Sequence, residues 1–169
     1  EPMDVTQKRR LWELLVKIGM QEIEVGFPAA SQPDYDFVRW LIEADKIPDN
    51  VSLQVLVQAR PHLVERTFEA LRGVKRAIVH VYNSTSTVQR ERVFGRDRDG
   101  IKAIAAEGAR LLQQEAARYP DTEWVFQYSP EKARSVPFSR VTSYCSGVRI
   151  FFHSASVFGR VTSSLPSAA

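Results

Sequence analysis

The sequence contains little cysteine and no long apolar run, and both shortages narrow the classes of protein it can belong to. Its 169 residues include one cysteine, Cys145, so the chain can form no internal disulfide and no cysteine-based zinc site. No apolar run approaches the ~18 residues that a membrane-spanning helix needs. The N-terminus carries no apolar stretch typical of a secretory signal, and Glu1 stands where an initiator methionine is expected, which indicates a missing start. We therefore expect a cytoplasmic protein with no membrane partner.

Acidic residues are absent from the end of the chain. Residues 132–169 hold five Lys and Arg, nine Ser and no Asp or Glu, whereas residues 1–131 hold 18 basic and 20 acidic residues. The pI of about 9.2 therefore comes from the tail, where no interleaving of aromatic and basic residues favours nucleic-acid binding. The composition predicts a boundary at residue 131, followed by a Ser/Arg-rich, divergent and poorly ordered tail. We expect no nucleic-acid partner.

Apolar residues recur in two alternating patterns over residues 1–131. Helical spacing is found at residues 6–18, 34–43, 62–71 and 99–119. Short runs rich in β-forming residues lie at 22–26, 51–57, 77–82 and 123–128. Strands that alternate with helices of this length predict a parallel sheet with right-handed crossovers. Two α/β architectures fit this order, an open doubly wound sheet and part of a (β/α)₈ (TIM) barrel.

The two sides of the predicted strands differ in polarity, which helps to choose between these architectures. The polar side consists of Glu22, Glu24, Gln54, Gln58, His80, Tyr82, Gln127 and Ser129, and Leu56 shares it. A parallel strand buried on both faces normally reads apolar throughout. In a barrel, by contrast, one side of every strand lines the interior and converges at the carboxyl-end mouth, where barrel enzymes place their chemistry. The pattern therefore favours a partial (β/α)₈ barrel.

Candidate site residues cluster where the third and fourth predicted strands end. His80, Tyr82 and Asn83 precede a Ser/Thr-rich turn at residues 84–87, and an imidazole with a phenol can bind a carboxylate or carbonyl oxygen. The alternative is a hydrogen-bonded buried histidine followed by a turn that caps a helix. Glu131 could add a carboxylate at the same edge, or it could be a solvated residue in a turn.

The sequence assigns no chemical role to Glu24 or to the charged residues between 90 and 99. Glu24 points to the polar side of its strand, and a buried carboxylate there needs a partner that the sequence does not identify. Between residues 90 and 99, four arginines alternate with three acidic residues, which favours a solvated, salt-bridged face. The three histidines do not have the spacing of a metal-ligand pair.

Several longer motifs, in order and without large gaps over residues 1–131, resemble the 2-isopropylmalate synthase family. They are Glu22-Ile-Glu-Val-Gly-Phe-Pro-Ala-Ala-Ser-Gln32, Gln54-Val-Leu56, Ala77-Ile-Val-His-Val-Tyr-Asn-Ser-Thr-Ser86 and Gln127-Tyr-Ser-Pro-Glu131. The resemblance implies a catalytic (β/α)₈ barrel that depends on a divalent metal (Mg, Mn or Zn) and forms a homodimer. Its implied activity is that of an acyltransferase, which condenses acetyl-CoA with 3-methyl-2-oxobutanoate in leucine biosynthesis.

The resemblance also implies roles for particular residues. The substrate-binding residues it points to are Leu56, Tyr82, Asn83, His80 and Ser129. The first three would surround the side chain of the keto acid, and the last two would lie near its carboxylate. Glu131 would be the catalytic carboxylate that orders the site.

Parts of the family pattern are missing. The family's Arg-Asp-Gly-Asn-Gln segment would fall before Glu1, no His-x-His metal ligands occur, and the pattern stops after Lys132. We therefore expect an incomplete fragment that lacks the metal ligands and is inactive alone. The alternative is a non-catalytic half-barrel, a relic or an interaction module without metal.

Overall fold

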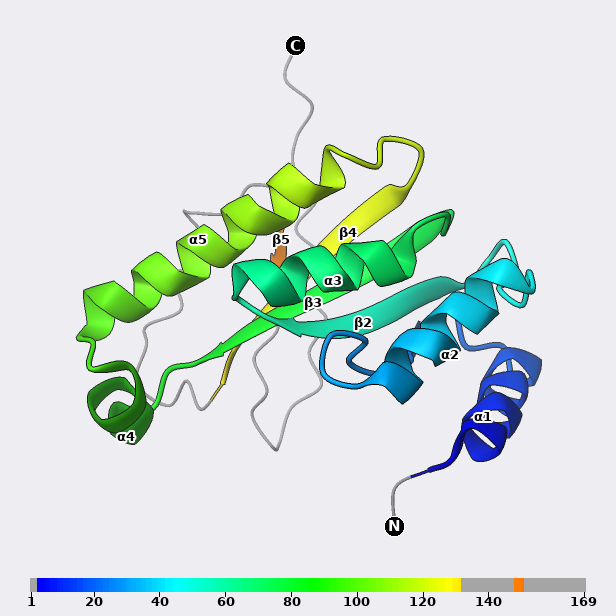
Figure 1. The fold of residues 1–169 in the computed structure, drawn as a ribbon, viewed down its shortest axis with the longest axis horizontal. Helices are drawn as coiled ribbons and strands as arrows, with labels where there is room; N and C mark the ends of the chain where they lie inside the picture. The colour runs from blue at the N-terminus through cyan, green and yellow to red at the C-terminus, as the bar shows by residue number, and fades with distance from the viewer. Residues whose placement is uncertain (1–2, 132–147, 151–169) are drawn as a thin grey trace.

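A computed structural model describes residues 3–131 and 148–150 of the chain (Figure 1). Its elements, in order, are α1 (Val5–Lys17), β1 (Glu22–Glu24), α2 (Gln32–Glu43), β2 (Ser52–Gln58), α3 (Pro61–Leu71), β3 (Arg76–Ser84), α4 (Thr87–Gln89), the π-helical turn η1 (Arg90–Phe94), α5 (Arg98–Ala116), β4 (Glu123–Glu131) and β5 (Val148–Ile150). The four predicted strands and four predicted helices are confirmed, with ends shifted by up to three residues. The short α4, η1 and β5 were not predicted, and β5 falls within the tail that was expected to be poorly ordered.

Local sequence signals fix where the helices begin. Asp4 accepts a hydrogen bond from the N–H of Gln7, and the Gln7 side chain accepts one from the N–H of Asp4, which makes a capping box before α1. Ser31 caps α2 and Asp97 caps α5, each by accepting a hydrogen bond from a main-chain N–H. These caps satisfy N–H groups that have no partner inside the helix.

The strands lie in the sheet in the same order as in the sequence. All neighbouring pairs, from β1–β2 to β4–β5, are parallel. The helices α2, α3 and α5 lie side by side over one face of this sheet (Figure 1). A doubly wound sheet would reverse its strand order and carry helices on both faces. The described residues therefore form part of the wall of a (β/α)₈ barrel, as the strand polarity predicted.

The apolar core lies between the sheet and these helices. Val55, Val57, Val79 and Val81 are buried on the helix side of the two central strands, and they pack with fully buried residues of α3 such as Phe68. The other side of these strands carries the polar set. The alternation predicted for a barrel is therefore confirmed, and the helices cover the apolar side.

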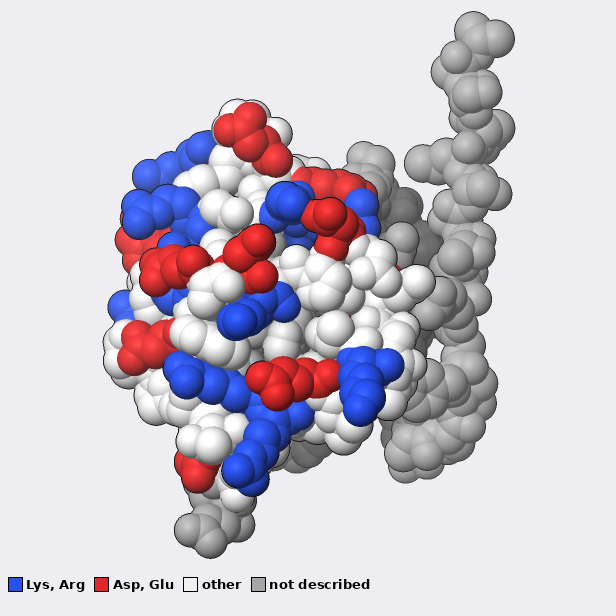
Figure 2. Space-filling view, turned by 90° about the vertical axis from the view of Figure 1, so that its right-hand side faces the viewer, with Lys and Arg blue, Asp and Glu red and all other residues white. Residues whose placement is uncertain are grey.

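Charged side chains are interspersed on the surface shown in Figure 2, where blue and red groups alternate over the described residues. One exposed pair joins the loops before β2 and β3: the Lys75 amine lies 2.7 Å from Asp49 Oδ1. Its hydrogen bond and charge lower the pKa of Asp49, and the same contact raises the pKa of Lys75. Exposed pairs of this kind add little to stability.

The last part of the chain is described only at β5, which pairs with β4 so that Val148 lies beside Phe126. The predicted disorder of the tail concerns residues 132–169, most of which lie outside the described residues. Within the described residues, no helix combines the length and the apolar character needed to cross a membrane.

Candidate active site

A buried hydrogen bond between His80 and Ser129 lies on the polar face of the sheet. The two atoms, His80 Nε2 and Ser129 Oγ, are 2.7 Å apart. His80 is 9% exposed and Ser129 is 5% exposed. They come from the neighbouring strands β3 and β4, where Ser129 lies beside Tyr82 in register. The prediction that these side chains share one side of the sheet is confirmed.

The second ring nitrogen of His80 lies near the carboxylate of Glu24. Its Nδ1 is buried without a hydrogen-bond partner in the described part of the chain, and the nearest carboxylate oxygen, Glu24 Oε2, lies 3.7 Å away. Gln54 holds that carboxylate through a hydrogen bond of 2.8 Å from its side-chain amide. The nearby negative charge favours the tautomer with its proton on Nδ1 and with Nε2 accepting from the Ser129 hydroxyl.

Glu24 differs from the expectation of a buried carboxylate. Its side chain is 41% exposed, because β1 is the outermost strand of the described sheet and has a neighbour, β2, on one side only. Gln54 is one partner that the sequence could not identify. It stands opposite Glu24 in the parallel register, on the same side of the sheet.

An aromatic pair lies near the carboxyl ends of the strands. The rings of Phe27 and Tyr82 meet edge to face, with centroids 6.4 Å apart and an interplanar angle of 78°. Phe27 was not among the predicted site residues. The available signal was its position in the loop directly after β1, since such loops form the mouth of a barrel.

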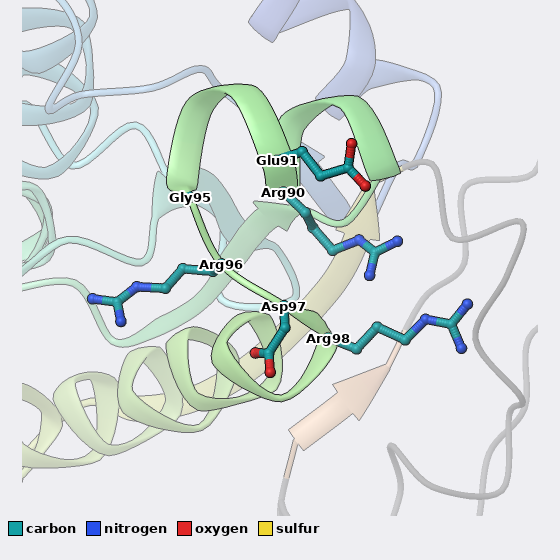
Figure 3. Close-up of a pocket in the computed structure, with 6 residues that line it drawn as sticks. All are labelled: Arg90, Glu91, Gly95, Arg96, Asp97 and Arg98. Carbon is teal, nitrogen blue, oxygen red and sulfur yellow. The ribbon is translucent and has the colours of Figure 1, made fainter.

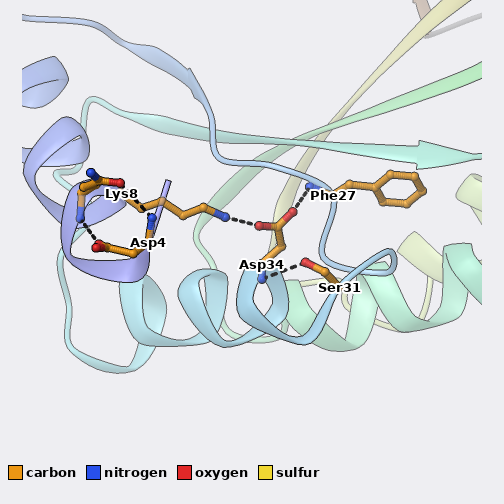
Figure 4. Close-up of polar contacts among 6 residues, drawn as sticks. Asp4, Lys8, Phe27, Ser31 and Asp34 are labelled. Atoms are coloured by element: carbon orange, nitrogen blue, oxygen red, sulfur yellow. Dashed lines mark hydrogen bonds and ion pairs between the residues drawn. The ribbon is translucent and has the colours of Figure 1, made fainter. Parts of the chain in front are cut away.

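Asp34 fixes the loop that carries Phe27 (Figure 4). Its carboxylate accepts a hydrogen bond of 3.1 Å from the Phe27 N–H and forms an ion pair with Lys8 of α1. Gly26 allows this arrangement, since its φ is +129° and an added Cβ would lie 2.9 Å from Asp34 Oδ2. Ser31 holds the main chain of Asp34 by capping α2. The aromatic ring at the mouth is therefore set by contacts outside the site itself.

The six predicted site residues are not all on one face. Leu56, His80, Tyr82 and Ser129 share the polar face. Asn83 has the opposite strand parity, and its Oδ1 accepts a buried hydrogen bond from the hydroxyl of Tyr128, a residue of the core. The main chain of Glu131 ends β4 beside Ser84, at the carboxyl edge. The keto-acid roles of five of these residues and the catalytic role of Glu131 remain predictions.

The Ser/Thr-rich turn after β3 had a structural alternative in the sequence analysis, that it caps a helix. Ser86 caps α4, so the helix-capping alternative is confirmed for this serine. Residues 90–99 are mostly exposed, as expected for a solvated face, but the expected salt bridges of the arginines are not found. Among the described residues, none of the four arginines lies within 4.0 Å of a carboxylate oxygen. The wide turn η1 and the left-handed Gly95 replace a regular helix here, so the sequence spacing does not bring opposite charges together.

Sequential parallel strands, helices on one face and polar side chains toward the carboxyl ends define a segment of a (β/α)₈ barrel with an enzyme-type mouth. The sequence profile of the HMGL-like family matches residues 1–152, and the chain belongs to this family.

Similar proteins support the resemblance noted from the motifs. The chain is 54% identical over 148 residues to the 2-isopropylmalate synthase of Pseudomonas fluorescens (strain Pf0-1), covering 88% of this chain and 26% of that protein. The synthase of Mycobacterium ulcerans (strain Agy99) is 53% identical over 148 residues, with the same coverages. The synthase of Corynebacterium glutamicum (strain R) is 59% identical over 131 residues, 78% of this chain and 21% of that protein. The chain thus spans about a quarter of the length of these relatives.

The family is generally dependent on a divalent metal. Within residues 3–131 and 148–150, no three His, Cys, Asp or Glu side chains lie close enough together to hold a metal ion. The described residues therefore do not fit a metal by themselves, and we assign no chemical step to one.

Proposed function

We propose that the chain is part of the catalytic barrel of a 2-isopropylmalate synthase-like acyltransferase of leucine biosynthesis. The observation that carries the proposal is the buried His80–Ser129 pair on the polar face of a barrel segment. Its support is the identity of 53–59% with proteins of that name. The proposal extends to a homodimeric, cytoplasmic whole protein.

The proposed reaction is a Claisen-type condensation. A base removes a proton from the acetyl methyl group of acetyl-CoA, and that carbon forms a bond to the keto carbon of 3-methyl-2-oxobutanoate. The keto oxygen gains a proton and becomes a hydroxyl. Water then hydrolyses the thioester, which releases CoA and leaves 2-isopropylmalate.

His80 and Ser129 would bind the carboxylate of the keto acid. The hydrogen bond between them fixes the imidazole ring, while Nδ1 of His80 is buried without a hydrogen-bond partner in the described residues. A buried donor left without a partner is costly, and a bound carboxylate would satisfy it. In this tautomer Ser129 donates its one proton to Nε2, so its part in binding the carboxylate would be to orient the imidazole ring.

The remaining roles follow from position. Leu56 and Tyr82 share the polar face with His80 and would contact the side chain of the keto acid. Asn83, proposed for the same pocket, would have to exchange its hydrogen bond with Tyr128 or support the strand end from the helix side. Glu131 would act from the end of β4, where its charge would organise proton transfer.

We propose that the 169-residue chain is inactive alone. The described residues offer no group of side chains that could hold a metal, and the relatives are more than three times as long as this chain. We propose that the residues of this chain bind and orient the keto acid. Other parts of the longer proteins would supply the group that polarises its carbonyl.

The test uses a chimera in which residues 1–131 replace the matching 131 residues of the Corynebacterium glutamicum synthase. His80→Ala should lower kcat/KM for 3-methyl-2-oxobutanoate by roughly 10- to 150-fold, since a hydrogen bond to a charged group contributes ~1.5–3 kcal/mol. The KM for acetyl-CoA should change far less. Glu131→Gln should instead lower kcat with a smaller effect on the keto-acid KM.

His62→Ala is the matched control, because His62 is an exposed histidine at the start of α3, and it should leave the kinetics unchanged. If His80→Ala lowers the melting temperature but leaves keto-acid kcat and KM unaltered, His80 is a core residue and the binding role is wrong. A non-catalytic half-barrel predicts no turnover in any version of the chimera.

A further inference from the structure

A second polar site lies on the loop between β3 and α5. A hollow of about 470 Å³ opens there (Figure 3). Its lining residues are Arg90, Glu91, Gly95, Arg96, Asp97 and Arg98. The loop follows the carboxyl end of β3, the strand that carries His80 and Tyr82. The hollow therefore lies on the rim of the proposed active site and is separate from the His80–Ser129 pair.

The arginines of this hollow carry charge that no acidic side chain neutralises in the described structure. None of the three lies within 4.0 Å of a carboxylate oxygen there. The Arg90 and Arg98 side chains extend to the same side of the loop, whereas Arg96 points the other way (Figure 3). Arg90 donates to Thr87 Oγ1 at 3.0 Å, and its Nε is buried without a hydrogen-bond partner among the described residues.

The two acidic residues of the hollow differ in their surroundings. Asp97 accepts a hydrogen bond of 2.8 Å from the Gly100 N–H as the N-cap of α5, so the positive end of that helix offsets its charge. Glu91 is exposed and remains the one acidic group in the lining that no helix end compensates. The net charge of the residues that line the hollow is therefore positive.

The backbone turns back on itself at this place, so both ends of one short segment line the hollow. The π-helical turn η1 ends at Gly95 in the left-handed conformation, and the Arg96 N–H then bonds back to the Arg90 carbonyl at 2.9 Å. This closure places Arg90 and Arg98 on one side of the hollow although eight positions separate them. Single π-helical turns are frequent at functional sites.

We propose that this hollow binds the phosphate groups at the nucleotide end of a CoA thioester, with Arg90 and Arg98 as its main ligands. Guanidinium groups match phosphate oxygens in charge and in forked geometry. The proposal rests on the proposed function, which makes an acyl-CoA the second substrate. The acyl end would reach the carboxyl edge of the sheet while the nucleotide stays at the solvent-facing rim.

The experiment is a calorimetric titration of the full 169-residue chain at low ionic strength with CoA, dephospho-CoA and pantetheine. CoA should bind, dephospho-CoA should bind more weakly, and pantetheine, which has no phosphate, should not bind measurably. Arg90→Gln and Arg98→Gln should each weaken CoA binding roughly tenfold. Added salt should weaken it as well, because the site is exposed.

Arg92→Gln is the matched control, because Arg92 is exposed on the same turn, does not line the hollow, and loses the same charge. It should leave the affinity for CoA unchanged, and melting curves should show that all three variants fold. If Arg92→Gln and Arg98→Gln weaken CoA binding equally, the effect comes from net charge alone and the proposed site is wrong. Pantetheine binding as tightly as CoA, or no binding of CoA by the chain, would also overturn the site.

Failure here is distinguishable from failure of the proposed function. The CoA titration contains no keto acid, so its outcome does not depend on the role proposed for His80. If the arginine variants have no effect on CoA while His80→Ala weakens keto-acid use in the chimera, the rim site is wrong and the proposed function stands. The reverse pair of results would overturn the keto-acid role and keep the phosphate site.

Discussion

Gly26 shows how one residue controls the mouth loop. Its φ of +129° is a conformation that side chains rarely adopt, and an added Cβ would lie 2.9 Å from Asp34 Oδ2. Asp34 in turn holds the N–H of Phe27 and the amine of Lys8. A side chain at residue 26 would therefore strain the backbone and displace the carboxylate that orders the loop.

We expect Gly26→Ala to destabilise the fold by ~1–3 kcal/mol, since a non-glycine residue held in such a conformation costs about this much. Gly19→Ala is the matched control, because Gly19 also has a positive φ, +86°, but an added Cβ there would meet no atom within 4 Å. Chemical denaturation of both variants measures the difference. Equal losses would mean that the Asp34 contact contributes nothing.

For single residues, the sequence could predict the position of a site side chain only where alternation along a strand fixes the face it lies on. His80, Tyr82 and Ser129 could be placed on one face because side chains alternate along a strand. The bond from Tyr128 to Asn83 could not be predicted, since a polar residue at a strand end can serve either face. The ring contact of Phe27 depends on a loop conformation that Asp34 imposes from another element.

At the scale of elements, α5 lies very close to the end of β2. An added Cβ at Gly108 would be 2.7 Å from the Cβ of Ala59 and 3.7 Å from a methyl of Val81. Glycine in mid-helix is otherwise unfavourable by ~1 kcal/mol relative to alanine. Its presence here is explained by the close approach of the helix to the sheet.

Gly108→Ala should therefore destabilise the fold by ~1–3 kcal/mol through overpacking, despite the better helix propensity of alanine. Combining it with Ala59→Gly should restore part of that loss, because the clashing methyl is removed. A double-mutant cycle from denaturation curves gives the coupling. Additive effects would show that the two residues do not meet as the structure places them.

The order of elements was predictable, and the segment between β3 and α5 was not. Helical and strand periodicities located all four long helices and the first four strands, since each buries a continuous apolar side. Residues 87–95 instead form a short helix, a π-helical turn and a left-handed glycine, and none of these has a regular apolar spacing. The expected salt bridges failed for that reason.

At the scale of the whole molecule, the sheet order and the polar face describe part of a barrel. The chain spans about a quarter of the length of its relatives, and the family profile continues to residue 152, beyond the predicted boundary at 131. That boundary stays a prediction, because residues 132–147 lie outside the described structure.

We expect the 169-residue chain to release no CoA from acetyl-CoA and 3-methyl-2-oxobutanoate with Mg²⁺, Mn²⁺ or Zn²⁺. The physical reason is that the keto carbonyl would remain unpolarised. A thiol assay against a reaction without protein measures this. Release above that background, lost in His80→Ala, would show that the chain is sufficient and that our account of its incompleteness is wrong.

The most direct test of the central claim is CoA release by the chimera with the unmodified segment. If residues 1–131 carry a working keto-acid site, the chimera should condense acetyl-CoA with 3-methyl-2-oxobutanoate at a rate within roughly tenfold of the parent synthase, a barrier difference of ~1.4 kcal/mol. A chimera that folds with the parent's melting temperature and yet releases no CoA would contradict the claim.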